Sequence, residues 1–435
     1  MMSEYKEILK KAEEADARIA NTLKWLLKRC ALETGPKLDE AEGSTKLSDD
    51  NGLEMMNEFL HSAAVRDKYF SGGVLDSESL RGIEQNEFQE KFFSFLSQRG
   101  EMETDPWIQY PKEFINKLAV YRNCGGTDEN QSKRLMDFSK KINNDPLRYV
   151  YEIIQNADDC EYKKAEERNI ARSMKLEFDA GEIWVSYPED GMTYSDIIAI
   201  TTIGESNKLK KKRRRIIGEK GMGFKTIFSV CDFVEIHSGP YHFKLTQDNF
   251  EPKWIEEKNG TAQDGDWSGT ELRLHFNQNI ENHDVENQKK ADEKNKVYEQ
   301  LLKKYGGTKD SVSVQNIFKN CPIMFTNKID ELCISCGEEK LVMKRRVKED
   351  NDTKIEEISY RFNKDDGEPD LSLKCIRIEK LVKFDYEKYK SHYKEVFESE
   401  ADYNNEEDEV KTYPVIVLIP VEVRQDGKPL SVSEI

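Results

Sequence analysis

Apolar residues recur every three or four positions through the first quarter of the chain. Between residues 3 and 31 they fall on one side of a helix. Further helices are predicted near residues 51–68, 77–98 and 110–121. Residues 33–50 are polar, with Gly, Pro and Ser, and are predicted to form a loop. Few strand patterns interrupt this part, so residues 1–125 are predicted to be a helical N-terminal region.

The pattern changes after a polar boundary loop at residues 123–130. A helix is predicted at about 131–142, and Pro146 suits the first turn of another that is expected to run to about residue 171. Strands are then predicted at residues 173–178, 182–187, 228–237, 241–245 and 267–274, with a helix at 194–201. Alternating helices and strands favour one α+β domain over residues 126–280.

The last third of the chain is predicted to form a second α/β domain over residues 281–435. It opens with a polar helical stretch at 281–305. Strand-like runs follow within residues 313–345, 355–383 and 412–423. The sequence stops soon after the last of these runs, so we expect this domain to be incomplete and the chain to be a fragment of a longer protein. A short natural chain is the alternative.

Polar residues line one face of the helix that follows Pro146. Glu152, Asn156 and Asp159 stand at positions i, i+4 and i+7, and aliphatic residues cover the other faces. Carboxylate and amide oxygens on a half-buried helix need partners, and hydrated Mg²⁺ is one that prefers oxygen ligands. A solvated surface stripe is the alternative, since these residue types are common at helical spacing.

A glycine loop precedes an apolar, helix-compatible run in residues 216–230. Gly218, Gly221 and Gly223 permit positive φ and close approach of a ligand to the backbone. Successive amides in such a loop form an anion site. The spacing differs from that of the Rossmann and Walker loops, so the loop by itself indicates only phosphate or another anion.

Together these stretches resemble the GHKL (Bergerat-fold) ATPase superfamily, and more closely its sacsin and NO VEIN branch. The similarity is carried by Ile-Gln-Asn-Ala-Asp-Asp at 154–159, Ile-Gly-Glu-Ser-Asn-Lys at 203–208 and Ile-Gly-Glu-Lys-Gly-Met-Gly-Phe-Lys at 217–225. The resemblance covers about residues 130–280. It implies a Bergerat-type α/β sandwich, and a chaperone-like or nucleic-acid or defence switch driven by nucleotide-dependent lid closure.

The resemblance also implies site roles. Glu152 would be the general base of a slow, magnesium-dependent ATP hydrolysis, and Asn156 would bind the Mg²⁺. ATP would be contacted by Asn156, Asp159, Asp190, Gly191, Met192, Gly218, Lys220, Gly221, Met222, Gly223, Phe224, Lys225 and Thr270. Thr270 follows a glycine at the start of a predicted strand, where the superfamily has a Thr that holds the adenine-reading acid.

One position departs from the superfamily pattern. Aligning residues 191–193 places Tyr187 where the superfamily has the acid that reads the adenine amino group. Tyr187 has no carboxylate, so Asp190 or Glu189 would have to serve from a shifted loop. This departure keeps open a second hypothesis, a catalytically degenerate nucleotide-binding scaffold.

The charge of the chain limits the kinds of partner that it is expected to bind. The formal net charge is −17, which disfavours bulk binding to nucleic acid, yet residues 208–215 hold seven cations in eight positions. This run falls in the lid region of the superfamily. A solvated or lid role is favoured, and a nucleic-acid-directed ATPase is the third hypothesis.

Composition indicates an intracellular protein, cytoplasmic or nuclear. No signal-peptide core and no bilayer-spanning apolar run is found in the sequence. Eight scattered cysteines do not suggest a disulfide framework, and Cys333-x-x-Cys336 lacks a second pair for zinc. The resemblance, and not the composition, implies ATP and Mg²⁺ as ligands, with a homodimer or the C-terminal domains of a longer protein as further partners.

Overall fold

The computed structural model describes residues 2–15, 17–38, 47–48, 50–62, 65, 70–71, 74–75, 85–99, 105–124, 148–179, 182–201, 224–246, 250–256, 269–276, 300, 321–350, 353–364, 367–383, 412–425 and 428–429. These residues belong to two compact units, residues 1–298 and 299–435, which are considered separately. The predicted boundaries at 125/126 and 280/281 both lie outside the described residues, as does the predicted helix at 131–142. Of the predicted helix at 281–305, only residue 300 is described, and it is helical.

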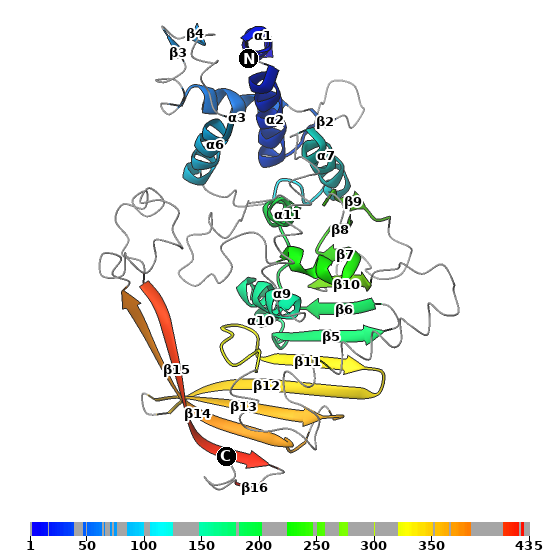
Figure 1. The fold of residues 1–435 in the computed structure, drawn as a ribbon, viewed down its shortest axis with the longest axis vertical. Helices are drawn as coiled ribbons and strands as arrows, with labels where there is room; N and C mark the ends of the chain where they lie inside the picture. Colours follow the sequence, from blue (N-terminus) through cyan, green and yellow to red (C-terminus); the bar gives the residue numbers. More distant parts are fainter. Residues whose placement is uncertain are drawn as a thin grey trace. The chain divides into compact units, whose positions relative to one another are not determined.

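The first unit begins with the predicted helical region (Figure 1). Its helices are α1 (Met2–Ala15), α2 (Ala17–Thr34), α3 (Asp50–Leu60), α6 (Gln85–Arg99) and α7 (Pro111–Cys124). Two short strand pairs accompany them: β1 (Lys37–Leu38) with β2 (Leu47–Ser48), and β3 (Phe70–Ser71) with β4 (Val74–Leu75). Apolar side chains at helical spacing on α2 pack with α3 and α6, where Phe59 and Phe92 are fully buried. The predicted helices are confirmed where the structure describes them, whereas the loop predicted at 33–50 contains the end of α2 and the strands β1 and β2.

An antiparallel sheet forms the rest of the first unit. Its strands, in spatial order, are β5 (Ser173–Asp179), β6 (Glu182–Tyr187), β10 (Thr270–Phe276), β7 (Cys231–Ser238), β8 (Tyr241–Thr246) and β9 (Lys253–Trp254). Alternate residues of β6, β7, β8 and β10 are buried, which is the period expected of a sheet with one core face. The predicted hairpin and the three later strands are confirmed.

Four helical segments accompany this sheet. They are α9 (Arg148–Asp159), α10 (Lys163–Glu167), α11 (Tyr194–Thr201) and the 3-10 helix η2 (Phe224–Ser229), and α9 packs against η2. The α11 prediction is confirmed. The prediction that one helix runs to about residue 171 is wrong, because α9 ends at Asp159 and α10 ends before Asn169, whose φ of 55° is left-handed.

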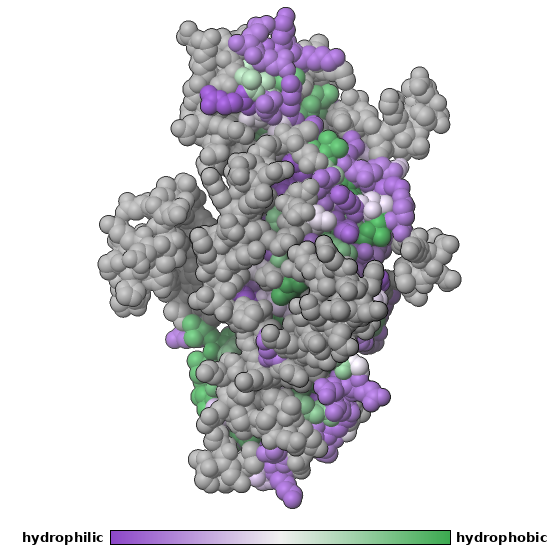
Figure 2. All heavy atoms as spheres, turned by 45° about the vertical axis from the view of Figure 1, so that its right-hand side comes forward, coloured by the Kyte–Doolittle hydropathy of each residue, from purple (hydrophilic) through white to green (hydrophobic). Residues whose placement is uncertain are grey.

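The second unit is an antiparallel meander of consecutive strands. They are β11 (Glu331–Cys336), β12 (Glu339–Asp350), β13 (Thr353–Phe362), β14 (Leu371–Lys383), β15 (Thr412–Gln425) and β16 (Lys428–Pro429). Buried residues of β12, β13 and β14 form its core, including Met343, Tyr360 and Leu373. Burial alternates along β13, whereas residues 341–343 of β12 and 371–373 of β14 are buried in succession. On β15, by contrast, Val415, Val417, Ile419 and Val421 are exposed. Exposed apolar side chains appear as green spheres among the purple hydrophilic ones in Figure 2.

The mixed α+β composition is thus confirmed, whereas the Bergerat-type arrangement stays a prediction. Among the described helices, none combines the length and the apolar character needed to cross a membrane.

Candidate functional site

The polar stripe of α9 is half-buried, as the sequence indicates. Val150, Ile153 and Ala157 are buried on the other faces. The Glu152 side chain is 15% exposed, and Arg148 Nε donates to its Oε1 over 3.1 Å. Asn156 and Asp159 are intermediate in exposure. The stripe is therefore partly exposed, and the Glu152 carboxylate is oriented by Arg148.

The segment after α9 is fixed to the loop that leaves β6. The Asp190 N–H donates to Glu161 O over 2.8 Å, and Lys164 N donates to Asp190 Oδ1 over 2.9 Å. Lys164 Nζ also donates to Asp190 O, over 2.7 Å. The Asp190 carboxylate therefore faces the first turn of α10, where it meets unpaired helix amides.

Glu189 points the other way, into the protein, and is only 3% exposed. The Thr270 hydroxyl donates to Glu189 Oε1. Ser238 Oγ lies 2.5 Å from Thr270 Oγ1 and 3.4 Å from Glu189 Oε1. The Gly191 amide also donates to the Glu189 carboxylate. The structure thus brings Glu189, and not Asp190, to Thr270.

Burial dominates the electrostatics of this carboxylate. It raises the pKa of Glu189 from 4.5 to about 6, against the opposing effect of the Thr270 hydrogen bond. Burial likewise raises the pKa of Tyr162 and Tyr187, and the nearby Cys160 and Glu189 raise both further. Tyr162 OH donates to Ala157 O over 2.8 Å, and the Asp190 N–H donates to Glu161 O, so the loop that carries Glu189 lies beside the segment that ends α9.

The start of β10 approaches this loop closely. Gly269 has a φ of 84°, and a Cβ there would lie 2.3 Å from Tyr187 O. Only glycine fits, since the close neighbour is backbone. The glycine before Thr270 therefore allows the threonine hydroxyl to reach Glu189, which gives the Gly-Thr pair of the sequence a structural reason.

The position of Tyr187 explains the departure from the superfamily pattern. Tyr187 pairs with Thr270 in the sheet register, and its side chain is buried in the core. Ile183, Val185 and Tyr187 all face inward on β6, and Glu189 continues the same alternation two residues later. The motifs left Glu189 and Asp190 as alternatives, and Asp190 was the predicted contact. The inward alternation of β6 is the sequence signal that distinguishes Glu189 from Asp190.

Met192 connects this cluster to α11. Its N–H donates to Ser238 Oγ over 2.7 Å. Thr193 then begins the helix with a reciprocal capping box, in which Thr193 N donates to Asp196 Oδ2 over 3.0 Å and Asp196 N donates to Thr193 Oγ1 over 3.3 Å. Gly191, with a φ of 99°, makes the sharp turn between Glu189 and this helix start.

The glycine loop falls largely outside the described residues. Gly218, Lys220, Gly221, Met222 and Gly223 are among those not described, as is the basic run at 208–215. Phe224 and Lys225 are described, buried in η2 beside α9. Lys225 Nζ lies 5.8 Å from the centre of the Phe250 ring. The end of the loop is therefore next to the helix that carries Glu152.

The Cys-x-x-Cys pair lies in β11. Cys333 and Cys336 are three residues apart on that strand, so they face opposite sides of the sheet and cannot chelate one ion. Within the described part of the chain, no group of three or more His, Cys, Asp or Glu side chains is arranged to hold a metal.

Comparison with known proteins gives one relative. The chain is 32% identical over 113 residues to Protein NO VEIN of Arabidopsis thaliana. The aligned part is 26% of this chain and 4% of that protein, so the chain spans only a small part of its relative. No family model matches the sequence. The similarity agrees with the NO VEIN part of the resemblance noted from the motifs.

Proposed function

We propose that residues 126–280 bind ATP with magnesium and hydrolyse it slowly, as a GHKL-type nucleotide switch. The observation that carries this proposal is the buried Glu189 carboxylate, held by the Thr270 and Ser238 hydroxyls beside the end of α9. A carboxylate in such a place would accept a hydrogen bond from the exocyclic amino group of adenine, which is the role that the superfamily gives to an acid paired with a threonine.

The donor set fits a purine better than a bulk anion. Glu189 is an acceptor, while Thr270 and Ser238 are both donors and acceptors, so the cluster can match an amino group next to a ring nitrogen. A buried acid that accepts a donor loses part of the desolvation cost that raises its pKa. ATP binding would therefore relieve the electrostatic cost of burying Glu189.

Glu152 is the residue expected to act on the nucleophile. In this role its carboxylate would orient a water molecule and accept its proton. The 3.1 Å contact from Arg148 holds the carboxylate in place, and Arg148 is half-exposed, so it can move aside when a ligand enters. Arg148 and Glu152 both lie on α9, so the helix fixes their positions relative to each other.

The remaining contacts follow from the resemblance. Asn156 would supply an amide oxygen to Mg²⁺, four positions from Glu152 on the same helix face. Magnesium, when bound, would neutralise part of the negative charge on the phosphate oxygens. Gly218, Gly221 and Gly223 would supply backbone amides to the phosphates, with Lys220 and Lys225 as charge partners. These roles fit the chemistry of the residues.

ATP binding and turnover should be measured with Mg²⁺ for the parent and Glu152→Ala. A positioned base contributes about 10²–10⁴-fold, so we expect turnover to fall by that factor while binding is kept. Glu161→Ala, two residues beyond the end of α9, is the matched control and should keep both properties.

The other outcomes separate the hypotheses. Binding without turnover in the parent would favour a nucleotide-responsive scaffold that needs further domains of a longer protein or a second copy. Equal turnover in the parent and Glu152→Ala would remove Glu152 from the base role. No ATP binding by the parent would disprove the proposed function.

A further inference from the structure

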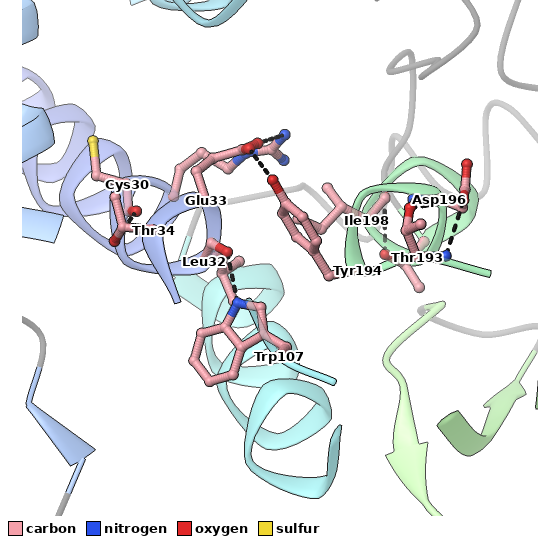
Figure 3. A network of polar contacts seen from close by, with 11 residues as sticks. Cys30, Leu32, Glu33, Thr34, Trp107, Thr193, Tyr194, Asp196 and Ile198 are labelled. Atoms are coloured by element: carbon pink, nitrogen blue, oxygen red, sulfur yellow. Dashed lines mark hydrogen bonds and ion pairs between the residues drawn. The ribbon is translucent and has the colours of Figure 1, made fainter. Parts of the chain in front are cut away.

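A buried polar network joins the N-terminal helices to the first turn of α11 (Figure 3). It includes side chains from α2, from the turn at residues 105–110 and from α11. The described members of this network lie within the first unit. None of its side chains belongs to the candidate site, although α11 begins five positions after Glu189.

The first link of the network is a buried ion pair on α2. Arg29 donates to Glu33 Oε1 from Nε over 3.0 Å and from Nη2 over 2.7 Å. Arg29 is 1% exposed, and its guanidinium also lies over the rings of Phe93 and Tyr121. The other carboxylate oxygen of Glu33, Oε2, accepts the Tyr194 hydroxyl over 3.1 Å. A charge-assisted hydrogen bond thus connects α2 to the first residue of α11.

The second link is Asp105. Its Oδ2 accepts the backbone N–H of Tyr194 over 2.9 Å and the hydroxyl of Tyr241 over 2.8 Å. Its Oδ1 accepts the Trp107 N–H over 2.9 Å. Asp105 therefore meets one of the amides that α11 leaves unpaired at its start, and a carboxylate there also interacts favourably with the helix dipole.

The turn that carries Asp105 is itself held on α2. Trp107 Nε1 donates to Leu32 O over 2.7 Å, and Trp107 is 1% exposed. Gly35, just beyond α2, lies so close to Pro106 that a Cβ would approach the proline Cβ to 2.5 Å. The end of α2 and the 105–110 turn are thus one packed body, and it holds Tyr194 at both its backbone and its side chain.

Tyr194 is connected to Glu189 by a short segment that is fixed along its length. Asp190 is bonded to Glu161 and Lys164, Met192 to Ser238, and Thr193 to Asp196. Ser238 contacts both Met192 and Glu189. Because this segment is held at each of these positions, a displacement of Tyr194 should also displace the Glu189 carboxylate.

We propose that the N-terminal helical region is a positioning element for the nucleotide site, acting through Glu33, Asp105 and Tyr194 on the loop that carries Glu189. The inference rests on the proposed function in so far as the ligand is ATP. Coupling between two sites is reciprocal, so ATP bound at Glu189 must stabilise the docking of α2 by the factor by which docked α2 strengthens ATP binding.

The test uses the full chain with Tyr194→Phe, which keeps the ring and removes the hydroxyl that reaches Glu33. Tyr360→Phe is the matched control, since Tyr360 is a fully buried tyrosine of the second unit. Amide hydrogen exchange is measured without nucleotide over residues 189–201, and ATP affinity is measured by calorimetry with Mg²⁺. Thermal unfolding confirms that each variant is folded.

We expect Tyr194→Phe to speed exchange about tenfold both in α11 and in residues 189–193, and to weaken ATP binding about fivefold or more. Tyr360→Phe should do neither. Asp105→Asn, which removes a capping carboxylate without changing the size of the side chain, should reproduce the effect of Tyr194→Phe.

Unchanged exchange at residues 189–193 would overturn the proposal, as would faster exchange with unchanged ATP affinity. Because the exchange comparison needs no nucleotide, it remains decisive if the parent fails to bind ATP. Failure of the proposed function and failure of this positioning role are therefore separate results.

Discussion

Glu189 in the first unit and Glu356 in the second are both buried carboxylates, and the chain stabilises them in different ways. Glu356 is 0% exposed, and Arg377 Nη1 donates to its Oε2 over 2.5 Å. Burial still raises its pKa, against the lowering effects of Arg377 and Arg345. Glu189 is held by the hydroxyls of Thr270 and Ser238 and by the Gly191 amide.

The difference separates a structural acid, Glu356, from Glu189, the acid that we propose binds a ligand. A guanidinium and a carboxylate pair by charge and geometry, and breaking such a buried pair leaves an uncompensated ion. Hydroxyl groups can rotate and exchange donor for acceptor, so the Glu189 cluster can reorganise around an incoming amino group at small cost. The following predictions test this contrast.

The largest effect is expected from Glu356→Ala. Removing one member of a buried ion pair should lower the free energy of unfolding of the second unit by about 3–5 kcal/mol. All five tryptophans precede residue 299, so far-UV circular dichroism follows both units while tryptophan fluorescence follows the first alone. In urea denaturation, Glu356→Ala should shift the transition seen by circular dichroism and leave the transition seen by tryptophan fluorescence unchanged.

Glu422→Ala is the control for that experiment, since its partner Lys374 lies 2.9 Å away on the surface. Its loss should change the free energy of unfolding by no more than about 1 kcal/mol. Equal losses from the two variants would contradict the structural role of the Glu356 pair.

A smaller effect is expected from pH on the first unit. The pKa of Glu189 rises from 4.5 to about 6 on folding, so the folded state holds more protons than the unfolded state between these values. The free energy of unfolding must then fall as pH rises through this window, by about 2 kcal/mol. Glu189→Gln removes this contribution.

Urea denaturation followed by tryptophan fluorescence from pH 4.5 to pH 7 measures this difference. The parent should lose about 2 kcal/mol relative to Glu189→Gln across the range. If the two stability curves run parallel, the Glu189 carboxylate is not the buried, hydroxyl-held acid described here.

The smallest of the three effects concerns ligand affinity. Glu189→Gln replaces a charged acceptor by an amide, and we expect ATP binding to weaken about tenfold. Asp190→Asn is the control, because the Asp190 carboxylate faces α10, and it should change the affinity less than twofold. Calorimetry with Mg²⁺ measures both variants, and a larger loss from Asp190→Asn would reverse the assignment of the base-reading acid.

Helices and strands could be predicted from the sequence wherever the spacing of apolar residues followed one clear helical or strand period. The α9 stripe, the β5–β6 hairpin and α11 were all visible as residue spacing, because each buries one face against the rest of the protein. The length of α9 was not predicted, because its end depends on Tyr162 reaching back to Ala157 and on the contacts of Asp190 with the next turn. These are contacts between segments, which no local pattern contains.

The candidate site was predictable in its types of residue but not in its pairing. Thr270 was singled out by its glycine, and the structure supplies the reason in the close approach of Gly269 to Tyr187 O. Glu189 could be distinguished from Asp190 only by extending the inward alternation of β6 two residues beyond the end of the strand. The Glu33–Tyr194 contact joins positions 161 residues apart, and only the fold brings them together.

Asp105 has a consequence for how the protein is made. It accepts hydrogen bonds from Trp107, Tyr194 and Tyr241, and the last of these lies 136 residues further along the chain. At about 5–20 residues per second, a ribosome needs about 7–27 seconds to add those residues. Trp107 packs against Leu32 and Phe114, which precede Tyr241 in the chain, whereas two of the hydrogen bonds of Asp105 cannot form until Tyr194 and Tyr241 have been synthesised. The Asp105 carboxylate is therefore the part of this contact that is completed last during synthesis.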